Sequence, residues 1–105
     1  MPDEPIRILL VRTWTEPLTP LRALLRDAQL AAKIVRVDIE AALQAALDRR
    51  EGFDVVVFDP ASCAITRATL DARLREHRCH APVVVLGPID ELVDAIRDAL
   101  RARHN

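Results

Sequence analysis

Apolar positions along the chain alternate between short runs and longer stretches that carry a single apolar stripe. Runs rich in apolar and β-branched residues occur at 7–11, 33–37, 53–59 and 82–86, and runs of this length are typical of buried strands. After each run, apolar residues recur at spacings of three and four, which places side chains on one face of a helix. The pattern therefore predicts four strands, each followed by a helix.

The predicted helices have recognisable ends. Thr19 can act as an N-cap and Pro20 suits the first helical position, so the first helix is expected to begin there. Asp38 is expected to cap the second helix, and Gly52 is expected to stop it. The side chains expected to face the core are Leu21, Leu24, Leu25 and Ala28 in the first helix; Ile39, Ala42, Leu43, Ala46 and Leu47 in the second; Leu70 and Leu74 in a helix over 66–78; and Ile89, Leu92, Val93, Ile96 and Leu100 in the last.

Strands that alternate with helices imply right-handed crossovers and a parallel sheet covered by helices on both faces. We expect the strand order 2-1-3-4, with the first and third strands central because they are the most apolar. The expected fold class is thus α/β, a three-layer flavodoxin-like sandwich formed by a single domain over residues 1–105. In such sheets the loops after the carboxyl ends of the strands form the functional crevice. On that edge the sequence places Arg12, Thr13, Trp14, Asp38, Asp59 and Gly87.

The composition limits the classes of partner. Charged residues make up 30% of the 105 residues, yet the formal net charge is only −1. Nucleic acids and anionic membranes favour a basic excess, so neither is an expected partner. The longest apolar runs are strand-sized and the first residues lack an apolar leader, so we expect a cytoplasmic protein. Cys63 and Cys79 form no C-x-x-C pattern, and both are expected to be reduced thiols.

Several segments share the pattern of one signalling family. On these segments the chain resembles the receiver domain of response regulators in two-component signalling. The resemblance implies a flavodoxin-like fold and places Asp59 at the family's phosphoacceptor position. The segments are Ile6–Val11 (IRILLV), Leu21–Ala28 (LRALLRDA), Glu40–Leu47 (EAALQAAL), Gly52–Asp59 (GFDVVVFD), Ala81–Gly87 (APVVVLG) and, in the last helix, ELVDAIRDALR.

The chain departs from the receiver pattern around that aspartate. Receivers hold Mg²⁺ with an acidic pair after the first strand, where this chain has Arg12 and Thr13. Mg²⁺ takes oxygen ligands, usually including carboxylates, and a guanidinium repels it. The Ser or Thr that ends the fourth strand in receivers is Gly87 here, and the family's fifth strand with its Lys has no counterpart. The resemblance therefore implies a truncated, degenerate receiver, or pseudo-receiver.

A second resemblance concerns the fold alone. The lactose/cellobiose-type IIB phosphotransferase subunits are similar in length and also have four parallel strands in the order 2-1-3-4. Those subunits carry a phosphorylated Cys directly after the first strand, where this chain has Arg12, Thr13 and Trp14. This resemblance therefore implies the fold without the phosphotransfer chemistry.

Asp59 has two interpretations. In an active, atypical receiver it would accept a phosphoryl group, but that transfer depends on charge neutralisation by a metal and a Lys. We favour an ion pair with Arg12 across the ends of the first and third strands, in which a fixed cation replaces the metal. Trp14 is either a lid on the core or a binding anchor, and an anchor would suit a small-molecule binder at the crevice.

The remaining candidate chemistry is weak. His77, Cys79 and His80 could contribute to a zinc site, but their spacing matches no standard zinc motif, and a solvated helix end is favoured. No glycine-rich turn follows the first strand, so Asp38 is expected to be a helix cap rather than a ligand for dinucleotide ribose. No Ser-His-Asp or Cys-His set is indicated. We therefore expect no enzyme activity, no metal and no cofactor.

The last strand suggests how the chain acts. With four strands, the fourth becomes a long apolar edge, and exposed edges of this kind are usually covered. We therefore expect an interface with a protein partner or with a second copy, most simply in a homodimer. The expected function is a phosphorylation-independent signalling or protein-interaction module. The residues expected at the interface are Val84, Leu92, Val93, Ile96 and Leu100.

Overall fold

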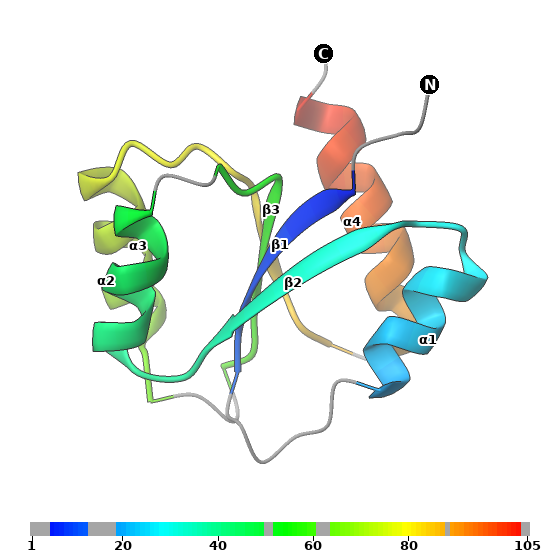
Figure 1. Cartoon of the computed structure of the whole chain (residues 1–105), viewed down its shortest axis with the longest axis horizontal. Coiled ribbons are helices and arrows are strands. Elements are labelled where there is room, and N and C mark those ends of the chain that lie inside the picture. The colour runs from blue at the N-terminus through cyan, green and yellow to red at the C-terminus, as the bar shows by residue number, and fades with distance from the viewer. Residues whose placement is uncertain (1–4, 13–18, 50–51, 61–63, 88, 104–105) are drawn as a thin grey trace.

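The computed structural model describes residues 5–12, 19–49, 52–60, 64–87 and 89–103 of the chain. Strands and helices alternate from the first element to the last, as the hydrophobic pattern predicted (Figure 1). The strands are β1 (Ile6–Val11), β2 (Ala32–Val37), β3 (Val55–Phe58) and β4 (Val83–Val85), and the helices are α1 (Thr19–Asp27), α2 (Glu40–Asp48), α3 (Arg67–Glu76) and α4 (Ile89–Arg103).

The four strands form one parallel sheet in the predicted order, β2-β1-β3-β4. The central strand β1 is paired on both sides, so that Ile8 lies in register with Ile34 of β2 and with Val55 of β3. Helices cover both faces of the sheet, which makes three layers (Figure 1). The fold is therefore α/β and flavodoxin-like, and the prediction of the fold class is confirmed.

Each face of the sheet has its own core, because successive side chains of a strand point to opposite faces. Leu9 and Leu10 of β1 are both fully buried, yet they belong to different clusters. One cluster lies between the sheet and helices α2 and α3, and the other between the sheet and helices α1 and α4 (Figure 1). This two-sided burial explains why β1 and β3 are apolar almost without interruption.

The third and fourth helices begin and pack largely as their sequences predicted. Thr66 caps α3, and its hydroxyl oxygen accepts a hydrogen bond from the Thr69 backbone N–H at 3.1 Å. Leu70 and Leu74 are buried on the sheet side of that helix.

In the part of the chain that the structure describes, no helix is both long enough and apolar enough to cross a membrane.

The start of α2 differs from the prediction. Asp38 does not cap this helix, because the N-cap position falls on Ile39, which has an extended backbone and no side-chain acceptor. Ile39 is also 52% exposed, so it is not part of the buried stripe to which the spacing assigned it. The helix begins with Glu40, whose negative charge in the first turn suits the helix dipole. After the helix, Gly52 adopts a φ of +74°, a conformation that favours glycine.

Two strands are shorter than their apolar runs suggested. The strand expected over 53–59 is Val55–Phe58, and the strand expected over 82–86 is Val83–Val85. Strand length depends on the partner as well as on the sequence, and β4 pairs only with the three residues 56–58 of β3. The fourth strand is therefore a short edge, and the expectation of a long one was wrong.

Because Leu10 is fully buried under α1 and α4, truncating it should destabilise the whole domain. We expect Leu10→Ala to lower the free energy of unfolding by about 2–5 kcal/mol, since the cavity adds to the lost burial. Ile39→Ala removes an exposed side chain and should change it by less than about 0.5 kcal/mol. Urea denaturation followed by circular dichroism measures both values. Equal effects of the two substitutions would contradict the assignment of the core.

Candidate functional site

The carboxyl edge of the sheet brings together the residues that follow β1 and β3. Arg12 directly follows β1, and Asp59 directly follows β3. Both backbones extend the sheet ladder by one step: the Arg12 N–H donates to the Val37 carbonyl and the Asp59 N–H to the Val11 carbonyl, each at 3.0 Å. Because β1 and β3 are neighbours, the ladder fixes the two side chains next to each other.

Arg12 and Asp59 form an ion pair in which Nε of Arg12 lies 3.2 Å from Oδ2 of Asp59. Among the described residues, Asp59 is the only charged residue that is buried, with 8% of its surface exposed. A carboxylate withdrawn from water is costly unless it is paired, so the guanidinium supplies a countercharge that belongs to the chain itself. The sequence-based prediction of this ion pair is confirmed.

The other predicted crevice residues are placed less completely. Thr13 and Trp14 lie outside the described residues. Gly87 follows the end of β4 and is exposed, and a Cβ added there would meet no atom within 4 Å. A larger side chain would therefore fit at Gly87. Steric crowding does not explain why this position has a glycine instead of the Ser or Thr found in receivers.

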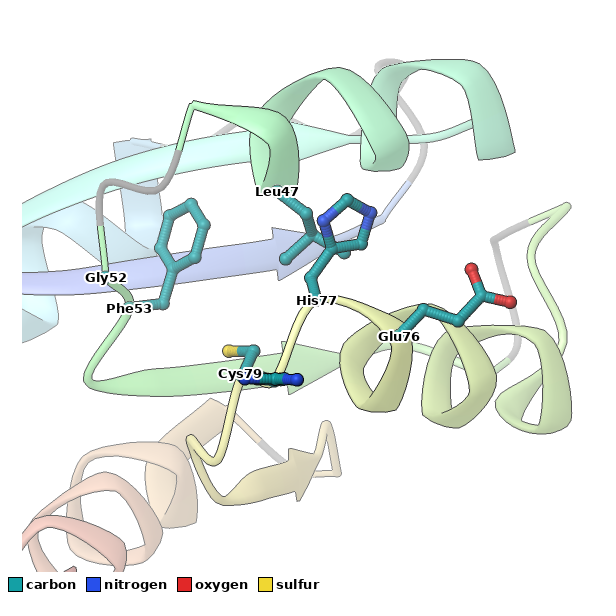
Figure 2. Close-up of a pocket in the computed structure, with 7 residues that line it drawn as sticks. Leu47, Gly52, Phe53, Glu76, His77 and Cys79 are labelled. Atoms are coloured by element: carbon teal, nitrogen blue, oxygen red, sulfur yellow. The ribbon is translucent and has the colours of Figure 1, made fainter.

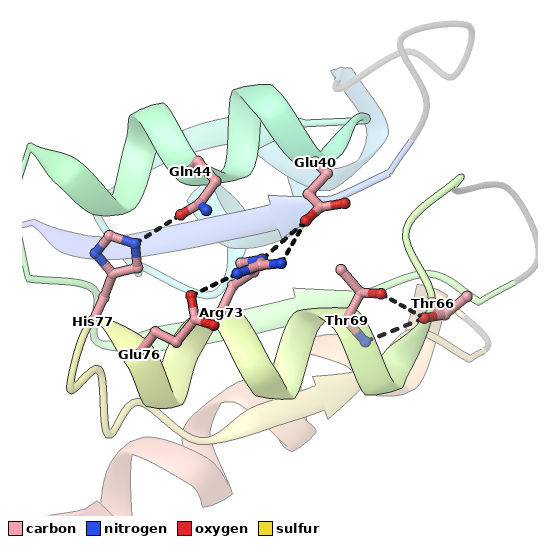
Figure 3. A network of polar contacts seen from close by, with 7 residues as sticks. All are labelled: Glu40, Gln44, Thr66, Thr69, Arg73, Glu76 and His77. Atoms are coloured by element: carbon pink, nitrogen blue, oxygen red, sulfur yellow. Dashed lines mark hydrogen bonds and ion pairs between the residues drawn. The ribbon is translucent and has the colours of Figure 1, made fainter.

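A second polar cluster, which the sequence analysis did not predict, joins helices α2 and α3 (Figure 3). Arg73 contacts Glu40 at 2.8 Å and Glu76 at 2.6 Å, so one guanidinium connects the two helices. The hydrogen bond and the charge of Glu76, with a smaller contribution from Glu40, raise the pKa of Arg73 above its usual value. His77 and Gln44 are hydrogen-bonded at 2.8 Å, one helical turn further along α2. The cluster holds the two helices together on one face of the sheet.

A cavity of about 480 Å³ opens at the end of the sheet opposite to the ion pair, where β3 begins and where α2 and α3 end (Figure 2). It is lined by residues that include Leu47, Phe53, His77 and Cys79. His77 also lies 3.6 Å from an Asp48 carboxylate oxygen, while Cys79 packs against the core under α2 and α3. Within the described ranges no group of three or more His, Cys, Asp or Glu side chains could hold a metal ion. Among the described residues, the lining of the cavity therefore provides no recognisable set of metal ligands.

No protein-family model, curated protein or solved structure matches this chain. The flavodoxin-like fold by itself does not fix a function, because such folds carry many unrelated sites. A proposal about function must therefore rest on the geometry of this chain. Its best-defined polar feature is the Arg12–Asp59 ion pair at the carboxyl ends of β1 and β3.

The ion pair should be energetically coupled, and a double-mutant cycle measures the coupling. Arg12→Met leaves the buried Asp59 without this guanidinium, and we expect a loss of about 2–4 kcal/mol of stability. Asp59→Asn removes the carboxylate charge. Its effect on the free energy of unfolding should therefore be smaller in the Arg12→Met variant than in the wild-type chain. We expect a coupling energy of about 1–3 kcal/mol from denaturant unfolding.

The matched control is the ion pair between Arg67 and Asp71, which is 3.0 Å long but 47% and 41% exposed. Solvent screens such a pair, so its coupling energy should stay below about 0.5 kcal/mol. A coupling for Arg12 and Asp59 as small as that of the control would show that the buried pair does not organise this edge.

Proposed function

We propose that this chain is a receiver-like protein-interaction module whose activity does not depend on phosphorylation, and which acts as a homodimer. The observation that carries the first part is the Arg12–Asp59 ion pair. A phosphoacceptor carboxylate must present an oxygen to the phosphoryl donor, while Asp59 is buried and contacts a guanidinium. The resemblance to receivers supports the receiver-like part of the proposal, and the ion pair supports its independence from phosphorylation.

The electrostatics of the edge support this proposal. Phosphoryl transfer depends on cations that neutralise the charge of the transferred group, and receivers use Mg²⁺ held by carboxylates. Here the position after β1 carries Arg12, whose positive charge repels Mg²⁺ and already neutralises Asp59. A fixed cation cannot be gained or lost with signalling, so the edge stays in one electrostatic state.

The β4 side of the sheet supports an interaction function. Among the residues that the structure describes, β4 is paired with β3 alone, and its Val85 is 53% exposed. Val84, Val93 and Leu100 are partly buried on the face that β4 shares with α4. A strand of only three residues offers little edge for backbone pairing, so we place the contact on its apolar side chains, which a partner would shield from water.

The interface residues expected from the sequence divide into two groups. Leu92 is 3% exposed and Ile96 is fully buried, because both pack against the sheet of their own chain. They therefore stabilise α4 on the sheet and are not part of the proposed contact surface. The contact surface that we propose is formed by Val84, Val93 and Leu100 on one face of the sheet and by Val85, whose side chain points to the opposite face of β4. We call these four residues the β4 surface.

A second copy of the chain is the occupant that the charges of α4 favour. The exposed positions of the helix carry both acidic and basic side chains, including Asp94 and the Asp98–Arg101 pair, whereas Arg97 donates a hydrogen bond to the Ala28 carbonyl of its own chain. In a two-fold interface the same surface meets itself in the opposite direction, so a mixture of both signs can pair with its own copy. A surface of one sign would repel a second copy instead.

Phosphorylation independence is tested by amide NMR spectra recorded during titration with Mg²⁺ and beryllofluoride, and with Mg²⁺ and acetyl phosphate. We expect no shifts centred on Asp59 and Gly87, since Arg12 stands where receivers carry a metal-binding acidic residue. The control is Arg12→Asp, which places two carboxylates at the ends of β1 and β3 and should respond to Mg²⁺. Wild-type shifts centred on Asp59 would establish an active, atypical receiver and overturn the proposal.

Self-association is tested by sedimentation at micromolar concentrations. We expect a dimer, and we expect Val85→Glu to weaken it by about tenfold or more, because the substitution buries a charge at the interface. Ile39→Glu is the matched control, since Ile39 is equally exposed but lies at the start of α2. A wild-type monomer, or equal effects of the two substitutions, would refute the proposed dimer.

A further inference from the structure

The second edge of the sheet, formed by β2, differs from the β4 edge in length and in charge. β2 has six residues and, in the part of the chain that the structure describes, pairs with β1 alone. Its side chains include Lys33 and Arg36, and natural proteins use charged side chains on edge strands to limit pairing with unsuitable strands. Along this edge a further strand could add to the sheet.

The hydrogen bonds between β1 and β2 show which backbone groups face the open edge. The Ile6 N–H donates to the Ala31 carbonyl, and the Arg12 N–H donates to the Val37 carbonyl. Backbone groups of successive strand residues point to alternate sides, so the odd-numbered residues of β2 face β1. The N–H and C=O groups of Ala32 and Ile34 therefore point to the open edge.

The same two residues line a groove of about 570 Å³ between α1 and β2. Leu25 and Leu30 contribute apolar walls, while the side chains of Ala32 and Ile34 form the side that belongs to the strand. A peptide strand paired with β2 would direct every second side chain toward α1. Those side chains would enter this groove, so the backbone edge and the groove would contact the same ligand.

The charge of the groove indicates the chemistry of that ligand. Arg22 and Arg26 line the groove one helical turn apart on α1, and both are exposed. Among the described residues that line the groove, none is acidic. An apolar groove with two arginines and no acid suits side chains that are partly apolar and partly acidic.

We propose that the β2 edge binds an extended, acidic segment of a partner protein by strand addition. The backbone of Ala32 and Ile34 provides the hydrogen bonds, the groove accepts alternate side chains, and Arg22 and Arg26 select acidic residues. Strand addition of this kind combines affinity from the main chain with specificity from pockets. Because β2 and β4 lie at opposite edges of the sheet, this proposal holds or fails independently of the β4 dimer.

A second copy of the chain fits this edge poorly. Two copies joined through β2 would each contribute Arg22, Arg26 and Lys33 to the same interface, and like charges across an interface are costly. A partner segment with glutamate or aspartate side chains turns the same charges into attraction. This charge complementarity is the reason for choosing an acidic segment as the occupant.

The test uses two synthetic peptides of equal length, one alternating glutamate with valine and the other alternating lysine with valine. We expect the acidic peptide to shift the amide signals of β2 in NMR spectra and to slow hydrogen exchange at Ala32 and Ile34. The lysine peptide should do neither. Equal binding of both peptides, or unchanged exchange at Ala32 and Ile34, would overturn the proposal.

Two variants locate the contact on the chain. Arg26→Glu should weaken the acidic peptide by about fivefold or more, because it replaces attraction by repulsion. Arg75→Glu makes the same charge change at an exposed position on α3, across the sheet, and should leave the affinity within about twofold. Ala32→Pro removes the backbone N–H that points to the open edge of β2, and it leaves the hydrogen bonds between β2 and β1 in place. This substitution should also weaken binding of the acidic peptide. Equal affinities for Arg26→Glu and Arg75→Glu would place the peptide elsewhere.

Discussion

The burial of β1 and β3 on both faces is the constraint on which the rest of the structure depends. A strand of this kind is stable only if helices cover both faces of the sheet, and four short helices do so here. The same constraint places the two strands in the centre, side by side and parallel. The residues that leave them, Arg12 and Asp59, therefore emerge next to each other into surroundings that exclude most of the water, where opposite charges must pair.

That ion pair determines what the carboxyl edge can do. In many flavodoxin-like proteins this edge carries the chemistry, because loops and strand ends converge there. In this chain the converging charges neutralise each other through a side chain that is always present. Because Arg12 supplies the countercharge to Asp59, we expect the contacts with partners at the edge strands β2 and β4.

The two edges differ in ways that suit different partners. β4 is short and apolar and lies beside a helix with mixed charges, which matches a contact between identical copies. β2 is longer, and its groove is lined by two arginines without an acid, which matches a ligand of opposite charge. One small sheet could thus hold a dimer at one edge and an extended segment at the other.

The elements, their order and the Arg12–Asp59 ion pair could all be predicted from the sequence. Unbroken apolar runs report burial on both faces, and the rules for parallel sheets then make the ends of β1 and β3 neighbours. Tertiary structure alone decided the links between α2 and α3, since Arg73 reaches Glu40 and His77 reaches Gln44 across 33 residues of sequence. It also decided between the two roles that the sequence suggested for Leu92 and Ile96, core and interface, because an apolar helical stripe has the same pattern whether it packs on its own sheet or on a partner. Strand length, the cap at Ile39 and the α1–β2 groove likewise depend on which surfaces meet, and that information resides in pairs of distant residues rather than in any local run.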